Sequence, residues 1–403
     1  MRVLLISSPS ATHIMPIVPL AWALRAAGHE VLVVGQPDIV ATARGAGLPV
    51  LAVRAFGDVF DAWELLPQGK RPIETGLFQV QDGQWEQMAR AWVIHAKQLS
   101  GQYLELARAW QPSLLLTDPL EFSALIVGGA LGVPVVQHRW GPEPLSHAGL
   151  GLARRLLDER AIMLGSPEGL PDPDLVLDPF PACWSVPGVP PGEQIRAVPY
   201  NGGGRAPAWA AEPPAGRRVC VSFGSVMLDL GGVPLVRHLV QAAAAMNDIE
   251  LVVTIGDSHR AMLGPVPPMV RLVPPTPLHT FIGSCAAVVH HGGGGTALTA
   301  LAHGVPQLLL PQMVDQFVRC ERIAASGAGL SLPDVSAQND PAALRDALSE
   351  VIEAAGYRET AGQLRDENAA QPSPAGMAGR LAALAALAAL TAGPSATEPS
   401  ARK

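Results

Sequence analysis

The sequence contains little charge, few aromatic residues and few cysteines. Charged residues make up 16% of the chain, the net charge is −7 and no basic stripe is present, so we expect no nucleic acid partner. The four cysteines lie far apart and none has CxxC spacing; they are Cys183, Cys220, Cys285 and Cys320. This pattern argues against a disulfide framework and a structural zinc site, and it fits a reducing cytosol.

Long hydrophobic runs are also missing. The apolar run Val3–Ile6 is too short for the core of a signal peptide. Leu381–Leu390, near the C-terminus, falls well short of the ~20 residues that span a bilayer. We therefore expect a cytoplasmic protein without a membrane segment. No cluster of Asp, Glu and His has the spacing of metal ligands, so no metal is expected.

What is present is enough apolar sequence for two cores. The chain has 403 residues, of which 48% are hydrophobic, and one core rarely serves a chain of this length. Short apolar runs that suit buried strands alternate with helical patterns, which predicts parallel sheets. The expected strands are Val3–Ile6, Val31–Val34, Leu114–Thr117, Val133–Gln137, Arg218–Ser222, Leu251–Ile255, Ala286–His290 and Gln307–Leu310. The expected helices are Pro16–Ala27, Ser123–Leu131, Pro234–Met246, Thr296–His303 and Met377–Leu390.

Proline and glycine become dense between the two halves, over Val186–Arg218. We predict an N-terminal domain at 1–205, a linker at 206–217 and a C-terminal domain at 218–375. A helix at 376–391 is expected to pack back across the domains, and the polar tail 392–403 is expected to be disordered. The predicted fold class is α/β, with two Rossmann-like βαβ domains facing across a cleft. Ligands of such sheets bind at the carboxyl ends of the strands.

A glycine-rich loop follows the expected strand that ends at His290. His291, the four glycines Gly292–Gly295 and Thr296 lead directly into a helix. Glycine lets the backbone approach a ligand closely, and the N–H groups and positive dipole end of the helix face the loop. We therefore predict an anion site. The motif is neither GxxxxGK[ST] nor GxGxxG, which argues against a P-loop nucleotide hydrolase and a dinucleotide site.

Several segments resemble nucleotide-sugar glycosyltransferases of the GT-B fold. His290–Gly304 (HHGGGGTALTALAHG) and Val305–Phe317 (VPQLLLPQMVDQF) resemble the donor-site signature of these enzymes. Val18–Val34 is similar to their opening, and Arg271–Cys285 to the segment that holds the nucleotide base. The nearest likeness is to bacterial enzymes that glycosylate macrolides and aromatic polyketides with dTDP-deoxysugars. It implies an acceptor-binding N-terminal domain and a donor-binding C-terminal domain.

The resemblance also implies a role for individual residues on the donor side. The β-phosphate would be bound by His291, Gly292, Gly293, Gly294, Gly295 and Thr296, and the other phosphate by Ser225. Base contacts would come from Pro275 and Thr276, although the family often has an aromatic residue where Pro275 stands. Asp315 and Gln316 match the pair that hydrogen-bonds the sugar hydroxyls. Gly294 stands where these enzymes often carry alanine, a change that we expect to be harmless.

His13 is the expected catalytic base. It lies in the first loop after a strand, its pKa suits proton transfer near neutral pH, and His13–Pro16 resembles the catalytic-histidine loop of the family. Asp118 ends another strand and would orient the His13 ring; a plain turn role before Pro119 is the alternative. The acceptor oxygen would attack the anomeric carbon in line, with inversion. The diphosphate would leave against the helix N–H groups, His291 and Thr296, without metal.

Acceptor contacts are the least constrained part of the prediction. Candidate lining residues for a flat polyketide or a macrolactone are Met15, Phe56, Trp63, Trp85, Trp140 and Glu143. Several fall in or near the irregular stretch 56–85, which we expect to be a functional loop or a flexible excursion. The expected partners are a nucleotide sugar and a small aglycone. A homodimer and an auxiliary activator protein, which some relatives need, are both left open.

Two other functions remain open on the sequence. The first is a nucleotide-sugar epimerase or hydrolase of the same architecture, which would need cleft carboxylates such as Asp118 and Asp315. The second is a non-catalytic protein that binds sugar nucleotides, in which His13 would be dispensable. Neither accounts for the apolar acceptor loops together with both halves of a transfer site.

Overall fold

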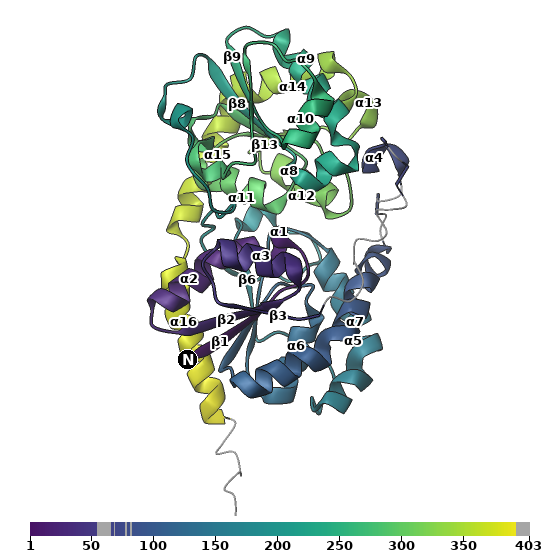
Figure 1. Cartoon of the computed structure of the whole chain (residues 1–403), viewed down its shortest axis with the longest axis vertical. Coiled ribbons are helices and arrows are strands. Elements are labelled where there is room, and N and C mark those ends of the chain that lie inside the picture. Colours follow the sequence, from purple (N-terminus) through teal and green to yellow (C-terminus); the bar gives the residue numbers. More distant parts are fainter. Residues whose placement is uncertain (55–65, 68, 77–78, 81–82, 392–403) are drawn as a thin grey trace, which may run out of the picture.

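The computed structural model describes residues 1–54, 66–67, 69–76, 79–80 and 83–391. It consists of two α/β domains stacked along the long axis of the molecule, with α16 running down the side of the first (Figure 1). Every strand pair in both sheets is parallel. Two Rossmann-like domains are therefore confirmed. The predicted tail, 392–403, lies outside the described residues.

The N-terminal domain has a seven-stranded sheet in the order β3-β2-β1-β4-β5-β6-β7. Its strands are β1 (Arg2–Ile6), β2 (Glu30–Gly35), β3 (Val50–Ala52), β4 (Leu114–Thr117), β5 (Val135–His138), β6 (Leu175–Asp178) and β7 (Glu193–Gln194). Its α-helices are α1 (Ala11–Ile14), α2 (Val18–Ala26), α3 (Pro37–Gly45), α4 (Pro72–Thr75), α5 (Trp85–Trp110), α6 (Phe122–Leu131) and α7 (Leu145–Leu164). Short 3-10 turns are η1 (Met15–Ile17), η3 (Ala182–Trp184) and η4 (Ala208–Ala211).

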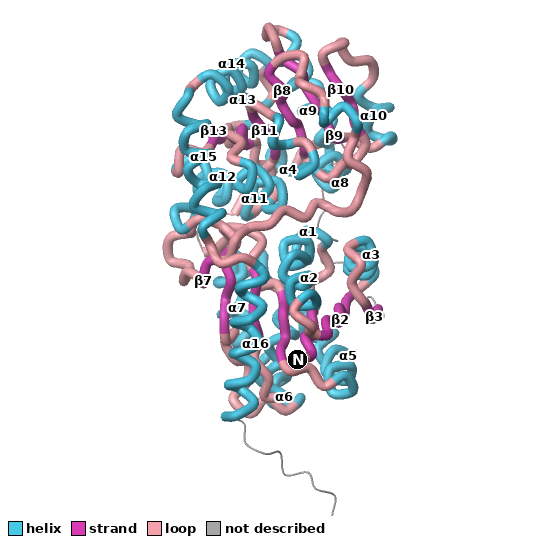
Figure 2. Tube along the Cα trace, turned by 90° about the vertical axis from the view of Figure 1, so that its left-hand side faces the viewer, coloured by secondary structure: helices cyan, strands magenta, loops and turns pink. Residues whose placement is uncertain are grey.

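Helices cover both faces of this sheet because its strands are apolar on both sides. Successive side chains of a strand point to opposite faces. In β1, Val3 and Leu5 join the cluster formed with α2, α3 and α16, while Leu4 and Ile6 join the one formed with α5, α6 and α7. In Figure 1, α2 and α16 lie on one side of the sheet and α5 on the other, and Figure 2 looks onto the side with α2 and α16. The continuous apolar runs of the sequence thus correspond to central, doubly covered strands.

The C-terminal domain has a six-stranded sheet in the order β10-β9-β8-β11-β12-β13. Its strands are β8 (Arg217–Ser222), β9 (Ile249–Thr254), β10 (Val270–Val273), β11 (Ala287–His290), β12 (Gln307–Leu309) and β13 (Gly329–Ser331). Its helices are α8 (Gly224–Met227), α9 (Val233–Ala244), α10 (Asp257–Leu263), α11 (Gly294–His303), α12 (Asp315–Ala325), α13 (Val335–Gln338), α14 (Pro341–Glu353) and α15 (Ala355–Ala370). A π-turn, η5 (Leu228–Gly232), precedes α9, and 3-10 turns occur at η6 (Leu278–Thr280) and η7 (Ile282–Ser284).

The predicted helix Pro16–Ala27 is divided into two pieces. The structure has the 3-10 turn η1 and then α2, and the short helix α1 precedes both. Proline lacks an N–H group and is tolerated only in the first turn of a helix. Pro16 and Pro19 each lie in the first two positions of a new element, which explains the division.

The chain that joins the two sheets, 195–216, contacts both domains. Ile195 and Tyr200 belong to the apolar core of the first domain. Trp209, in η4, lies 5.1 Å from the Arg218 guanidinium and 5.2 Å from that of Arg271, both of the second domain. Within the predicted linker, 206–217, Trp209 thus packs on the second domain, whereas Ile195 and Tyr200 belong to the part predicted as the N-terminal domain.

Helix α16 (Pro374–Thr391) returns from the second domain to the first, where it packs against α2. Its Met377, Leu381 and Ala385 are buried in the core of the first domain. Within the described residues it is the one helix long and apolar enough to cross a membrane by length and composition. Only 22% of this helix is buried, and Leu387 and Leu390 near its end are exposed.

Candidate active site

His13 and Asp118 meet where the first sheet changes direction. Strands β2 and β3 lie on one side of β1, whereas β4 and the later strands lie on the other. Such a switch point opens a crevice at the carboxyl ends of the two central strands. Ile6 of β1 pairs with Thr117 of β4, so the loop that carries His13 emerges beside Asp118.

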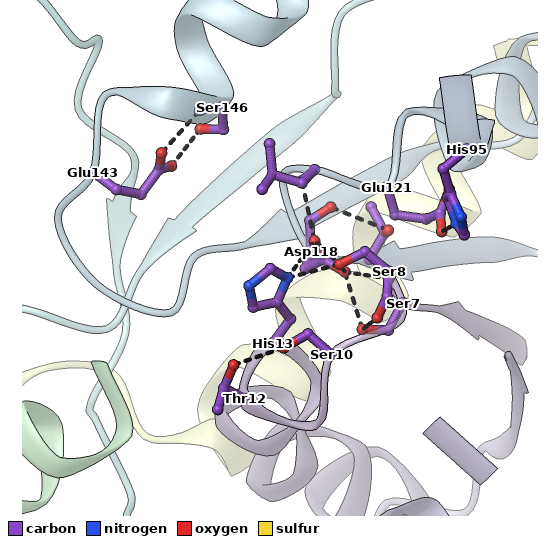
Figure 3. A network of polar contacts seen from close by, with 12 residues as sticks. Ser7, Ser8, Ser10, Thr12, His13, His95, Asp118, Glu121, Glu143 and Ser146 are labelled. Carbon is purple, nitrogen blue, oxygen red and sulfur yellow. Dashed lines mark hydrogen bonds and ion pairs between the residues drawn. The ribbon is translucent and has the colours of Figure 1, made fainter. Parts of the chain in front are cut away.

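Ser8 lies between these two side chains. Its Oγ is 2.7 Å from Nδ1 of His13 and donates to Asp118 Oδ1 and Oδ2 at 2.9 and 3.0 Å. The direct separation of His13 Nδ1 and Asp118 Oδ1 is 3.6 Å (Figure 3). Asp118 was expected to orient the His13 ring. In the structure that contact is indirect, and the Ser8 hydroxyl bridges the pair.

Asp118 is held rigidly as a carboxylate. It is 0% exposed and accepts from the Ser8 N–H at 2.7 Å, the Ser7 hydroxyl at 3.0 Å and the Leu120 N–H at 3.0 Å. Burial alone would raise the pKa of Asp118, but His13 and the donors of Ser8 outweigh it and lower this pKa. A plain turn residue would not gather this number of donors.

The hydrogen-bond network assigns the tautomer of His13. The Ser8 hydroxyl has one proton, which it donates to the Asp118 carboxylate. Its lone pair must therefore accept from the N–H at Nδ1 of His13. The free lone pair is then on Nε2, and Figure 3 shows this side of the ring directed away from Asp118. His13 is thus prepared to take a proton at Nε2.

Trp140 joins the His13 loop to the second domain. Its indole stacks on the His13 ring, with centroids 4.1 Å apart and planes inclined by 2°. Trp92 of α5 contacts the same ring at 5.4 Å. A Cβ added to Gly294 would lie under 3.0 Å from the Trp140 carbonyl oxygen and 3.2 Å from its Cδ1. Glycine at this position, expected to be a harmless replacement for the alanine of the family, thus fits closely against Trp140, whereas a Cβ would not fit without a shift.

The glycine-rich loop forms the predicted turn between β11 and α11. Gly292 has φ of 88°, and its N–H donates to Nδ1 of His290 at 3.1 Å. His290 Nε2 in turn lies 2.9 Å from Gln307 Oε1. The N–H of Gly292 is therefore engaged within the protein, and the groups at the start of α11, Gly293–Thr296, are the ones placed to hold an anion.

His291 is held neutral beside this loop. Burial, followed by the proximity of His290 and Arg319, lowers the pKa of His291 to about 3. Its Nδ1 is buried and has no hydrogen-bond partner among the described residues. A buried polar atom without a partner is costly unless a ligand or water satisfies it, which fits a residue at a binding site.

Asp315 and Gln316 begin helix α12, and both are engaged within the protein. Asp315 forms an ion pair with Arg319, whose other nitrogen donates to the Gly292 carbonyl at 2.7 Å. Gln316 Oε1 accepts from the N–H groups of Gln312 and Met313 at 3.0 and 3.3 Å. Arg319 therefore links the acidic residue of the expected sugar site to the phosphate loop.

The remaining donor residues lie at the same edge of the second sheet. Pro275 and Thr276 follow β10, and the Thr276 hydroxyl donates to the Pro274 carbonyl at 2.7 Å. Ser225 lies in α8 directly after β8; its side chain is outside the described part of the structure. Among described residues, no group of three or more His, Cys, Asp or Glu side chains could hold a metal ion.

The expected acceptor residues are dispersed. Phe56 and Trp63 lie outside the described residues. Met15, in η1, packs partly against the core of the first domain, and Trp85, at the start of α5, does so on the other face of the sheet. Trp140 is 6% exposed and occupied by its stacking on His13.

Glu143 lies inside the protein, although it was expected to line the acceptor site. It is 1% exposed, accepts from the Ser146 N–H at 2.8 Å and bonds the Ser146 hydroxyl, so it caps the start of α7. Burial raises the pKa of Glu143 to about 7, although Ser146 and Arg139 oppose this shift.

Sequence reasoning missed two residues of the site, Ser8 and Arg319. Ser8 belongs to the run Ser7-Ser8-Pro9-Ser10 directly after β1, so its place at a strand end could have indicated a polar role. Arg319 follows Asp315 by four residues, the spacing of an ion pair on a helix. Its contact with Gly292 needs the tertiary structure.

Comparison with known proteins is consistent across sequence and structure. Residues 22–224 match the N-terminal domain, and residues 237–384 the C-terminal domain, of the erythromycin biosynthesis protein CIII-like family. The chain is 36% identical to L-demethylnoviosyl transferase of Streptomyces niveus, over 94% of this chain and 97% of that protein. It is 32% identical to 10-deoxymethynolide desosaminyltransferase of Streptomyces venezuelae, over 94% and 96%.

A similar solved structure is that of spinosyn rhamnosyltransferase SpnG. It shares 38% identity and a TM-score of 0.85, covering 95% of this chain and 100% of that one. SpnG has also been solved in complex with thymidine diphosphate and with the spinosyn aglycone, with TM-scores of 0.84 and 0.83. Glycosyltransferase SnogD of Streptomyces nogalater is 32% identical, with a TM-score of 0.76 over 96% of this chain and 99% of that one.

Proposed function

Since the chain belongs to the erythromycin biosynthesis protein CIII-like family of glycosyltransferases, we propose that it moves a deoxysugar from dTDP to a polyketide aglycone with inversion, with His13 as base. That it is a glycosyltransferase of GT-B architecture follows from its named relatives and structural neighbours. These relatives are sugar transferases, so the epimerase, hydrolase and non-catalytic alternatives are set aside. The cytoplasmic location stays a prediction.

One observation carries the proposal: Trp140 contacts both halves of the site. It stacks on His13 at 4.1 Å, and its carbonyl oxygen abuts Gly294 of the glycine-rich loop. Trp140 thus contacts both the residue proposed as base and the start of the helix proposed to bind the diphosphate, which supports the proposal. An in-line displacement of a diphosphate would need a base and an anion site close together in this way.

In the proposed reaction, Nε2 of His13 removes the proton of the acceptor hydroxyl. The oxygen attacks the anomeric carbon as the bond from that carbon to the β-phosphate oxygen breaks. Positive charge that develops on the ring is stabilised through Ser8 by the Asp118 carboxylate. Negative charge on the leaving dTDP is stabilised by the N–H groups at the start of α11 and by neutral His291. The proposed step uses no metal.

The experiment is a transfer assay with a panel of dTDP-hexoses against aromatic polyketide and macrolactone aglycones. His13→Ala should lower kcat by about 10²–10⁴-fold, because a positioned base contributes that much, and leave dTDP affinity unchanged. His147→Ala is the matched control, since His147 is exposed on α7. Full activity in His13→Ala would exclude His13 as base. A product with the anomeric configuration of the donor would exclude single-step inversion.

A further inference from the structure

The segment before α4 of the first domain reaches across to the second domain. Lys70, Arg71 and the short helix α4 lie beside C-terminal elements, and Figure 1 shows α4 next to α12 and α13. Gly231 of η5, with φ of 80°, lies so close to Lys70 that an added Cβ would be 3.0 Å from the Lys70 carbonyl oxygen. The contact thus involves backbone of both domains.

Arg71 is the centre of this contact, and it is 2% exposed. Its Nη1 donates to Gln338 Oε1 at 2.7 Å and to Gln312 Oε1 at 3.3 Å, and its Nη2 donates to Asn339 Oδ1 at 2.7 Å. All three acceptors belong to the second domain and all are uncharged amides. A buried guanidinium loses its hydration and needs several hydrogen-bond acceptors in place of water. The three amide oxygens supply them, which a surface ion pair with a single carboxylate would not.

Glu74, one turn later, completes the arrangement. Its carboxylate accepts from the Arg71 N–H at 2.8 Å and from Asn339 Nδ2 at 3.2 Å, and it lies 3.5 Å from Arg71 Nη2. Burial lowers the pKa of Arg71, while the Glu74 carboxylate opposes that shift. Arg71 therefore donates to the Asn339 amide oxygen, and Glu74 accepts from the amide nitrogen of the same side chain.

The contact continues into the loop before α12. Gln312 Nε2 donates to Gln338 Oε1 at 2.7 Å and to the Leu310 carbonyl at 2.8 Å, so the Gln312 side chain is fixed. The N–H of Gln312 donates to Gln316 Oε1 at 3.0 Å. A continuous chain of hydrogen bonds thus leads from Arg71 through Gln312 to Gln316.

The next residues of this loop have a backbone that needs external support. Val314, immediately before Asp315, has φ of 45° and ψ of −125°. A β-branched residue avoids positive φ, and such a conformation persists only where the surroundings enforce it. The hydrogen bonds of Gln312 and Gln316 at one end, and the Asp315–Arg319 pair at the other, are the enforcing contacts.

We propose that Arg71 is a positioning residue for the donor sugar: by docking on the second domain it holds the 310–316 loop in the shape that presents Asp315 and Gln316. This rests on the proposed function, in which these two residues bind the sugar hydroxyls. Arg71 itself touches neither substrate. Sugar recognition by the second domain then depends on Arg71 of the first domain. The sugar is bound fully only when Arg71 contacts the second domain.

The test compares Arg71→Met, which keeps the aliphatic stem, with Lys70→Met as matched control, since Lys70 is the exposed neighbouring cation. The probes are dTDP and the dTDP-hexose with its aglycone that the panel above identifies. Arg71→Met should bind dTDP within about twofold of wild type and lose about 10–100-fold in kcat/KM for the dTDP-hexose. Lys70→Met should resemble wild type in both measurements. Rates are expressed per dTDP-binding site, so a loss of folded protein does not count.

Gln316→Ala separates this inference from the function on which it rests. The double variant Arg71→Met/Gln316→Ala should lose no more kcat/KM than Gln316→Ala alone, because both changes remove the same contact of Gln316 with the sugar. If Gln316→Ala leaves kcat/KM intact, the assignment of Gln316 to the sugar fails. If it lowers kcat/KM and Arg71→Met behaves like Lys70→Met, Arg71 is only structural and the inference is overturned. Should Arg71→Met not fold, Arg71→Lys decides in the same way, since one ammonium cannot bond Gln338, Gln312 and Asn339 in the same fork geometry.

Discussion

Gly294 gives the most direct test of how the two domains meet. The change Gly294→Ala adds one methyl group at the first residue of α11, where the backbone is not in the positive-φ region. Alanine is a better helix former than glycine, so α11 itself should not be weakened. The added Cβ would lie under 3.0 Å from the Trp140 carbonyl oxygen. The substitution therefore acts at the domain contact and not on the helix.

The size of the effect follows from this overlap. Ordinary contact between heavy atoms is about 3.5–4.0 Å, so Trp140 and α11 must separate by roughly 1 Å. Trp140 stacks on His13, hence the base and the phosphate loop move apart by a similar amount. A misplacement of about 1 Å can cost about 10²-fold in rate, equivalent to about 2.7 kcal/mol in the activation barrier. We expect kcat/KM of Gly294→Ala to fall by about that factor.

Gly356→Ala is the matched control, because Gly356 is an exposed glycine near the start of α15, has no role in the proposed site, and a Cβ there has no atom within 4 Å. Steady-state transfer rates and the calorimetric affinity for dTDP are measured for both variants. In the proposed site the nucleotide is held by the second domain, so both variants should bind dTDP as wild type does. Equal transfer rates in the two variants would refute the domain contact. Loss of dTDP binding in Gly294→Ala would place the defect in the phosphate loop instead.

Two further changes probe the buried polar groups. Ser8→Ala removes the bridge between His13 and Asp118. A lost buried hydrogen bond costs about 1–3 kcal/mol, so kcat should fall by about 5–150-fold. Ser10→Ala, whose hydroxyl bonds Thr12 alone among the described residues, should leave kcat unchanged, and equal rates in the two variants would contradict the bridge. Burial raises the pKa of Glu143 from 4.5 to about 7, so the folded state binds the extra proton and stability falls as pH rises between these values, by roughly 3 kcal/mol. Glu143→Gln should abolish that part of the pH dependence in thermal unfolding curves, and an unchanged profile would contradict it.

Local sequence patterns were enough to predict the central strands and the glycine-rich loop. β1, β4 and β11 are continuous apolar runs ending in polar residues, and burial on both faces of a parallel sheet requires that composition. The anion-binding loop could be predicted because glycine, which has no Cβ, adopts backbone conformations that other residues avoid. Helix α5, with 26 residues, was not predicted, and neither was α7. In α5 the buried Ala89, Trp92 and Ala96 already recur at helical spacing, so the pattern was present in the sequence and could have been used.

By itself, the sequence determined which side chains stand at strand ends, since those positions depend on local propensity and periodicity. Only the tertiary structure decided which of them meet. Ser8 bridges His13 and Asp118 because β1 pairs with β4, and Arg71 reaches Gln338 across 267 residues of chain. Likewise, Gly294 is constrained by Trp140, a residue of the other domain. Such contacts form only when strands pair and domains pack, so no local pattern in either segment predicts them.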